Sequence, residues 1–212
     1  ILGAEYVRDL QPGEVIRIRD GVVKQLRSLP PAEHPSPCIF ELVYFSRPDS
    51  RLWGISVDAA RRAFGRQLAK EHPVEADAVI AVPDSANSAA LGYAEESGIP
   101  FELGMLRHHY VGRTFIKPSQ EDRDFGARMK YSPVRGVLEG RRVVVVDDSL
   151  VRGTTSRSLV RMLRGAGADE VHFRIGSPPV KWPCFYGIDM PTKGELIGSE
   201  LEVPEIAGEL GV

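Results

Sequence analysis

Two adjacent carboxylates, Asp147 and Asp148, directly follow a run of four valines, and a short polar stretch follows them. That stretch contains Gly153, which would let the backbone approach a ligand closely, and the hydroxyl residues Thr154 and Thr155. If a helix begins there, its free backbone N–H groups and the positive end of its dipole would attract phosphate. The stretch lacks the G-x-x-x-x-G-K-[ST] pattern of a Walker loop. It therefore predicts a phosphate-binding loop of another type.

The two acids indicate what else the ligand carries. Carboxylates beside a phosphate site would repel a ligand that is only an anion, but they suit sugar hydroxyls or a metal ion. Ribose 5-phosphate supplies hydroxyls and phosphate, and a pyrophosphate group would bring Mg²⁺. An aspartate pair that merely caps a helix is the alternative. The sequence R-G-T-T at 152–155 favours the ligand site.

The pattern around these residues predicts an α/β fold. Continuous apolar runs predict buried strands, and segments rich in helix formers predict helices. The strands are expected at 77–83, 141–147 and 170–175, and the helices at 87–97 and 156–164. Gly98 is placed to end the first helix. This alternation is typical of a mainly parallel, twisted sheet with helices on both faces, in which ligands bind beyond the carboxyl ends of the strands.

The beginning of the chain has a different pattern. Residues 5–19 alternate between apolar and polar and predict two short strands around a turn at Pro12 and Gly13. Four prolines within 26–37 predict a linker. We therefore expect residues 1–36 to be the end of a preceding domain with its linker, and residues 37–212 to be the α/β domain. The start at Ile1 and the closing EIAGELGV predict a piece cut from a longer chain.

Composition limits the function. The chain has 212 residues, 42% of them hydrophobic, and a formal net charge of −2. A protein that binds nucleic acid through its phosphates is normally basic, so we expect no nucleic-acid partner. No apolar run approaches the roughly 20 residues that span a membrane, and no signal peptide is visible. Two cysteines far apart make no disulfide framework. A cytoplasmic protein is expected.

Several stretches resemble the amidophosphoribosyltransferase family, in the order in which that family has them. They are CIFELVYFSRPDS, AVPDSANSAALGYA, GIPFELG, YVGRTFI, VVVVDDSLVRGTTS and CFYGIDMPT. The stretch around Asp147 is similar to the signature of type I phosphoribosyltransferases. The resemblance covers nearly the whole chain. It implies a type I phosphoribosyltransferase fold, preceded in residues 1–36 by a remnant β-hairpin of an N-terminal glutaminase domain.

The resemblance implies that phosphoribosylpyrophosphate and Mg²⁺ bind at this site. It assigns Asp147 and Asp148 to the ribose hydroxyls and the metal, and Ser85 to the metal; without it, Ser85 would be interpreted as a turn residue after Pro83. The loop expected to hold the 5-phosphate comprises Ser149, Leu150, Val151, Arg152, Gly153, Thr154, Thr155 and Ser156.

Residues 110–132 match the flexible lid of that family, and their charges and glycines suit a mobile loop. The resemblance implies that Arg113 and Lys130 act catalytically on the leaving pyrophosphate. The alternative for both is a solvated surface charge. His108 and His109 occupy part of the family's basic stretch, and we assign them no role.

The implied reaction transfers ammonia to phosphoribosylpyrophosphate and gives 5-phosphoribosylamine, the first committed step of purine synthesis. Ammonia would come from glutamine in a glutaminase domain of the same polypeptide, an activity that we do not expect in this chain. The resemblance also implies purine nucleotides as feedback inhibitors and a homo-oligomer. A non-catalytic phosphoribosylpyrophosphate sensor and a base-salvage phosphoribosyltransferase are the alternatives. The presence of both acids, Arg113 and Lys130 favours an enzyme, and CFYGID argues against salvage.

Cys38 and Cys184 match two ligands of the [4Fe–4S] cluster that a subset of the family carries. Such a cluster normally needs four thiolates. The other two would lie beyond Val212, so the cluster is possible in a longer parent protein and not expected in this chain. Two free thiols are the alternative.

Overall fold

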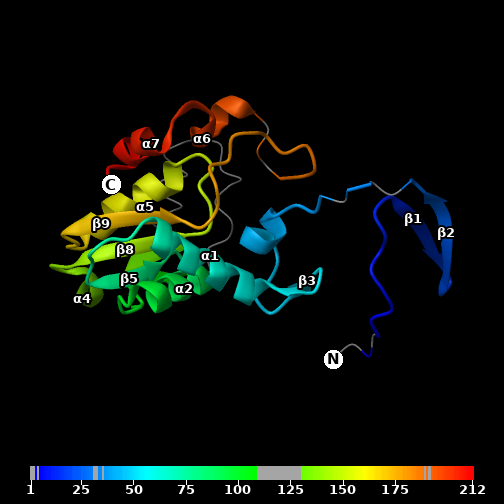
Figure 1. Ribbon diagram of the computed structural model, residues 1–212, viewed down its shortest axis with the longest axis horizontal. Helices are drawn as coiled ribbons and strands as arrows, with labels where there is room; N and C mark the ends of the chain where they lie inside the picture. Colours follow the sequence, from blue (N-terminus) through cyan, green and yellow to red (C-terminus); the bar gives the residue numbers. More distant parts are fainter. Residues whose placement is uncertain are drawn as a thin grey trace. The chain divides into compact units, whose positions relative to one another are not determined.

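The structure is a computed structural model, which describes residues 3, 5–30, 33–34, 36–108, 130–188, 190 and 192–212. The chain divides into two compact units, Ile1–Ile39 and Phe40–Val212. The first unit is blue and the second runs from cyan to red (Figure 1). That residues 1–36 end a glutaminase domain stays a prediction.

The first unit contains an antiparallel hairpin of β1 (Glu14–Arg19) and β2 (Val22–Ser28). The prediction of a hairpin around Pro12 and Gly13 is wrong, because the described residues before β1 form no strand. The hairpin turns instead at Asp20 and Gly21, whose φ angles are 50° and 75°. Two residues with positive φ give the turn whose twist matches that of the paired strands, and Asp-Gly is a preferred sequence for it. β2 also extends three residues into the predicted linker.

The second unit contains the remaining elements. In chain order they are the turn η1 (Glu41–Phe45), β3 (Arg51–Leu52), β4 (Ile55–Ser56), α1 (Val57–Glu71), β5 (Ala78–Ala81), α2 (Asn87–Ser97), β6 (Met105–Arg107), β7 (Tyr131–Pro133), α4 (Arg135–Leu138), β8 (Arg142–Asp147), α5 (Thr154–Gly165), β9 (Glu170–Ile175), the turn η3 (Lys193–Glu195), α6 (Ile197–Glu200) and α7 (Val203–Leu210). The predicted helix 87–97 is confirmed as α2, and Gly98 ends it with a φ of 73°.

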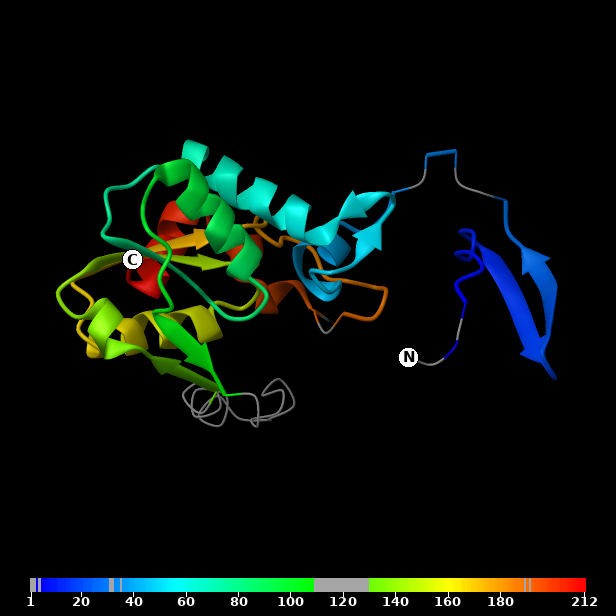
Figure 2. The ribbon, with the colours of Figure 1, turned by 90° about the horizontal axis from the view of Figure 1, so that it is seen from below.

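The site is built on a parallel sheet of three strands in the order β5-β8-β9, as expected for the α/β fold. Along the central strand, Val143 and Val145 belong to a core shared with α5, whereas Val144 and Val146 belong to a core shared with α1 and α2. Figures 1 and 2 show these helices on opposite faces of the sheet. Because both faces are covered, the strand is apolar throughout rather than alternating.

β6 and β7 form a separate antiparallel pair. Its strands begin and end the segment that contains the predicted lid, most of which lies outside the described residues. None of the helices in the described ranges is long and apolar enough to cross a membrane.

Candidate functional site

The acid pair lies at the carboxyl end of β8, the central strand of the sheet. Asp147 is half-buried and Asp148 is 7% exposed. The backbone N–H of Asp148 donates to Oδ1 of Asp147 at 2.9 Å, and the Ser149 hydroxyl donates to Oδ1 of Asp148. Burial raises the pKa of both carboxyls, and the charge of Asp148 raises the pKa of Asp147 further. Two acids that are costly to ionise would be stabilised by a bound cation or by ligand hydroxyls.

The predicted phosphate loop, 149–156, lies directly after the acids and extends into the first turn of α5. The helix begins at Thr154, two residues earlier than expected, so Thr154 and Thr155 lie in its first turn. Gly153 precedes it with a φ of 74°, and a Cβ there would lie 2.8 Å from Cδ1 of Ile197. Glycine is thus favoured by the backbone conformation, and a larger residue would also force the end of the Ile197 side chain to move. Since Gly153 has no side chain to cap the helix, the first backbone N–H groups face the loop without a side-chain cap.

The hydroxyl groups of this loop differ in exposure. Thr155 is exposed, Thr154 and Ser149 are half-buried, and Ser156 is only 4% exposed. Leu150 and Val151 are half-buried. Because their side chains are apolar, only their backbone groups are suited to binding a ligand.

The structure brings Ser85 to Asp148, the second acid of the pair. Ser85 lies in the turn after β5, and β5 is paired with β8 in parallel, so the ends of the two strands meet. A hydrogen bond from the Ser85 side chain lowers the pKa of Asp148, and both residues line one small cavity. Two carboxylates and a hydroxyl are oxygen donors, which Mg²⁺ prefers. These residues therefore fit the metal that the sequence predicts.

Arg61, in α1, is a site residue that the sequence analysis missed. Its side chain is 2% exposed and lines the same cavity as Asp148. Its Nε donates to the Leu42 carbonyl and its Nη2 to the Ser46 carbonyl, both at 2.8 Å. The charge of Arg61 lowers the pKa of Asp148, while burial lowers the pKa of Arg61 itself. A signal existed, because Arg61 lies four residues after buried Val57, on the apolar stripe of α1.

The two predicted lid cations differ in what the structure shows. Arg113 lies outside the described residues. Lys130 immediately precedes β7, and its carbonyl accepts a hydrogen bond of 2.8 Å from the backbone N–H of His108. The charge of Lys130 lowers the pKa of Asp147, and its Nζ lies 5.1 Å from the centre of the Tyr131 ring. Lys130 therefore lies near Asp147, at the edge of the sheet that carries the acid pair.

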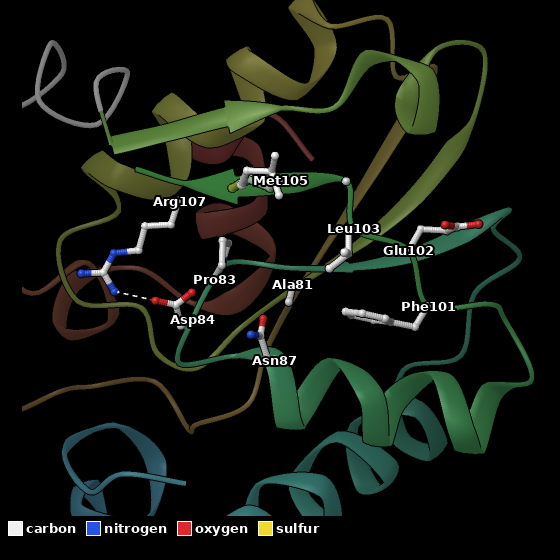
Figure 3. A pocket seen from close by; sticks show the side chains of 11 residues that line it. Ala81, Pro83, Asp84, Asn87, Phe101, Glu102, Leu103, Met105 and Arg107 are labelled. Atoms are coloured by element: carbon white, nitrogen blue, oxygen red, sulfur yellow. Dashed lines mark hydrogen bonds and ion pairs between the residues drawn. The ribbon is translucent and has the colours of Figure 1, made fainter. Parts of the chain in front are cut away.

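A second pocket adjoins the turn that contains Ser85 (Figure 3). Nη1 of Arg107, in β6, pairs with Oδ2 of Asp84 at 2.9 Å. The Nε of Arg107 is buried and has no hydrogen-bond partner within the described ranges. The Phe101 ring lines the opposite end of the pocket. A guanidinium and an aromatic ring suit a ligand with an anionic group and a planar ring.

The cysteines do not form a metal site by themselves. Cys38 is exposed and belongs to the first unit, whereas Cys184 is half-buried and belongs to the second. Over the part of the chain that the structure describes, no group of three or more His, Cys, Asp or Glu residues could hold a metal ion. The chain contains two cysteines, so it supplies at most half of the four thiolates of a [4Fe–4S] cluster.

Comparisons with known proteins agree on one family. The chain is 58% identical over 212 residues to amidophosphoribosyltransferase 1, chloroplastic, of Arabidopsis thaliana, covering all of this chain and 37% of that protein. It is 56% identical over 211 residues to the Bacillus subtilis amidophosphoribosyltransferase, covering all of this chain and 44% of that protein. No family model matches the chain.

A solved structure gives the same result. The glutamine phosphoribosylpyrophosphate amidotransferase from B. subtilis, complexed with ADP and GMP, superposes with a TM-score of 0.82 at 56% identity, covering 99% of this chain and 46% of that one. The type I phosphoribosyltransferase fold that the sequence predicts is thereby confirmed. The chain is therefore similar over its whole length to a part of the amidophosphoribosyltransferases, and it spans about two fifths of the length of the curated relatives that it matches.

Proposed function

We propose that this chain carries the phosphoribosyltransferase site of an amidophosphoribosyltransferase, which converts phosphoribosylpyrophosphate and ammonia into 5-phosphoribosylamine and pyrophosphate. The observation that carries the proposal is the acid pair at the end of β8, in which Asp148 lies beside Ser85 and a glycine-containing loop at a helix N-terminus follows directly. This arrangement offers oxygen ligands, hydroxyl partners and backbone N–H groups to one ligand. An activated ribose phosphate requires all three.

Each part of the site would bind a different part of the substrate. The 149–156 loop would hold the 5-phosphate through backbone N–H groups and the Thr154 and Thr155 hydroxyls. Asp147 and Asp148 would accept hydrogen bonds from the ribose hydroxyls. Mg²⁺, held by these carboxylates and Ser85, would supply charge neutralisation of the pyrophosphate when bound. The charge of buried Arg61 would help to hold the Asp148 carboxylate in place.

The reaction breaks the bond between the anomeric carbon and the pyrophosphate oxygen and forms a bond from that carbon to the ammonia nitrogen. The lone pair of ammonia makes the new bond, the bonding pair leaves with pyrophosphate, and one proton is lost from the nitrogen. Arg113 and Lys130 would stabilise the negative charge that develops on the leaving group. The acids would stabilise the positive charge that develops on the sugar. Ammonia is already a nucleophile, so no catalytic base is required.

The same proposal covers the partners. Ammonia would be produced from glutamine by a glutaminase domain of the same polypeptide, of which residues 1–36 would be the end. Purine nucleotides would act as feedback inhibitors, in line with the ADP and GMP named for the B. subtilis structure. The pocket between Phe101 and Arg107 has the chemistry to take part in binding them. A homo-oligomer is expected.

The test is calorimetric titration of phosphoribosylpyrophosphate with and without Mg²⁺. Replacing Asp147 or Asp148 by Asn should weaken the Mg²⁺-dependent affinity at least tenfold, or about 1.4 kcal/mol. The matched control is Asp169→Asn, because Asp169 is an exposed acid that precedes β9 at the other end of the sheet. If both site variants bind as tightly as the unchanged protein, the assignment of the acids is wrong.

A further inference from the structure

Residues 192–200, far along the chain from the phosphate loop, pack directly against it. The backbone N–H of Ile197 donates to the Val151 carbonyl at 2.9 Å. The next loop residue, Arg152, forms an ion pair with Glu195, in which Nε and Nη2 both lie 2.7 Å from Oε2. The residue after that, Gly153, lies so close to Ile197 that a Cβ there would be 2.8 Å from Cδ1 of Ile197. Three consecutive loop residues thus contact one short segment.

Glu195 is itself held in place. Its other carboxylate oxygen, Oε1, accepts a hydrogen bond of 2.9 Å from the Thr192 hydroxyl. Glu195 ends the turn η3, whose first carbonyl, that of Lys193, accepts a hydrogen bond of 2.7 Å from the Ser199 hydroxyl. The side chains of Arg152 and Glu195 are 22% and 39% exposed, so water screens the pair only in part. Charge-assisted hydrogen bonds to both carboxylate oxygens fix its direction.

The position of Arg152 matters to a loop that binds phosphate. The loop would bind its ligand largely through backbone N–H groups, and such a site is effective only when its conformation is fixed before the ligand arrives. Arg152 is the cation of this loop, and its guanidinium is directed to Glu195. Glu195 therefore anchors the loop at the residue immediately before the left-handed Gly153.

We infer that Glu195 is a positioning residue, which holds the 149–153 loop through Arg152 in the conformation that binds the sugar phosphate. The inference depends on the proposed function for the identity of the ligand. The predicted effect of Glu195 on the conformation of the loop does not depend on the proposed function, because the contacts between Glu195 and the loop exist without ligand. Glu195 itself would not contact the substrate.

The structure provides a matched control in α5, the helix that follows the loop. Nη2 of Arg157, in α5, pairs with Oε2 of Glu209, also at 2.7 Å. This pair links α5 to α7 after the loop has ended, with Arg157 and Glu209 side chains 35% and 56% exposed. Replacing Glu209 by Gln therefore removes a similar charge from the C-terminal segment without touching the phosphate loop.

The experiment compares Glu195→Gln, Arg152→Gln, their double variant and Glu209→Gln by two readouts. In Glu195→Gln the affinity for phosphoribosylpyrophosphate with Mg²⁺ should fall about fivefold, the effect of a partly exposed ion pair. The kcat should change less than twofold. In the Arg152→Gln background, Glu195→Gln should add almost nothing, because the pair is already broken. Glu209→Gln should bind as the unchanged protein does.

The second readout is amide hydrogen exchange of residues 149–154 without ligand. Exchange should become faster in Glu195→Gln and stay unchanged in Glu209→Gln. If the unchanged protein does not bind phosphoribosylpyrophosphate but the loop exchanges faster in Glu195→Gln, the proposed function fails and the positioning role stands. If exchange and affinity are the same in Glu195→Gln as in the unchanged protein, the positioning role is wrong. If Glu209→Gln changed affinity and exchange as much as Glu195→Gln does, the positioning role would also be wrong, since both changes would then indicate a general loss of stability.

Discussion

The backbone N–H of Asp148 donates a hydrogen bond of 2.9 Å to the carboxylate of its neighbour Asp147. This bond fixes the side chain of Asp147 at the end of β8, while Asp148 is bonded to Ser149 and lies near the buried Arg61. The two acids are thus held close together in a place where burial disfavours their charge. Such an arrangement lowers the stability of the ligand-free protein, and it is the kind of arrangement found at functional sites.

The first prediction concerns that stability. Asp147→Asn removes one of two adjacent carboxyl groups whose ionisation is disfavoured, but can keep the hydrogen bond from Asp148 through its amide oxygen. The pKa of Asp147 is raised in the folded state, so its ionised form at neutral pH destabilises the fold. We expect the melting temperature without Mg²⁺ and ligand to rise by about 2–4 °C, or about 1 kcal/mol. The Asp169→Asn control should melt as the unchanged protein does. A lower melting temperature for Asp147→Asn would show that its charge is compensated.

The second prediction concerns the lid cations. If Arg113 and Lys130 act on the charge that develops on pyrophosphate, replacing either by Ala should lower kcat with ammonia more than it raises KM. One such contact contributes about 2–4 kcal/mol, or roughly 30- to 1000-fold in rate. Lys70→Ala serves as control, because Lys70 pairs with Glu96 at 3.5 Å on the surface of α1. A rise in KM with unchanged kcat would mean uniform substrate binding, and no change in either would mean solvated surface charges.

The third prediction concerns the contact of α1 with α2, which supports Arg61 and Ser85. A Cβ at Gly65 would lie 1.8 Å from the Ala89 carbonyl oxygen, which neither backbone can avoid without moving. Gly65→Ala should therefore lower the free energy of unfolding by at least about 2 kcal/mol. Gly136→Ala is the control, because Gly136 lies in α4 with nothing within 4 Å of its added Cβ. Denaturant unfolding measures both, and a Gly65→Ala protein as stable as the control would contradict the close packing.

The fourth prediction is a pH dependence of stability. The Arg142 guanidinium and backbone N–H bind the carboxylate of Asp77 and lower its pKa to about 2. Because the pKa is lower in the folded state, this stabilisation is present above the unfolded pKa of about 4 and is lost as pH falls toward 2. Asp77→Asn should lower the melting temperature at pH 7 and reduce its fall between pH 4 and 2.

The neighbouring acid Glu75 is the control for this effect. It lies 3.7 Å from Nη1 of the same arginine, but its side chain is 96% exposed. Glu75→Gln should therefore leave the melting curve almost unchanged at both pH values. If Glu75→Gln and Asp77→Asn shift the melting temperature equally, the specific bond to Asp77 does not contribute.

Much of the site could be predicted from the sequence because it is local. The acids, Gly153 and the following helix lie within one strand-loop-helix unit, and the apolar run of β8 fixes its place at the sheet centre. Predicting Ser85 as a site residue required the family resemblance, since only the pairing of β5 with β8 brings Ser85 to Asp148. Arg61 and Glu195 escaped prediction because their partners lie 15 or more residues away along the chain.

The error at the first hairpin has a similar cause. Pro12-Gly13 and Asp20-Gly21 are both turn sequences, and alternation alone fits strands on either side of each. The positive φ at both Asp20 and Gly21 decides in favour of the second. The start of α5 was predicted two residues late, because Thr154 and Thr155 have side chains that are common in loops as well as in first turns.

The measurement that tests the central claim most directly is pyrophosphate release from phosphoribosylpyrophosphate and Mg²⁺ by the 212-residue chain, with the nitrogen source varied. Ammonium, glutamine, and free purine and pyrimidine bases are compared, and the products are separated by chromatography. We expect ammonium to drive release with 5-phosphoribosylamine as product, and glutamine and the bases to drive none. Release with a free base would make the protein a salvage enzyme. Tight substrate binding without release under any condition would make it a sensor, and equal rates with glutamine and ammonium would contradict the proposed division of activities.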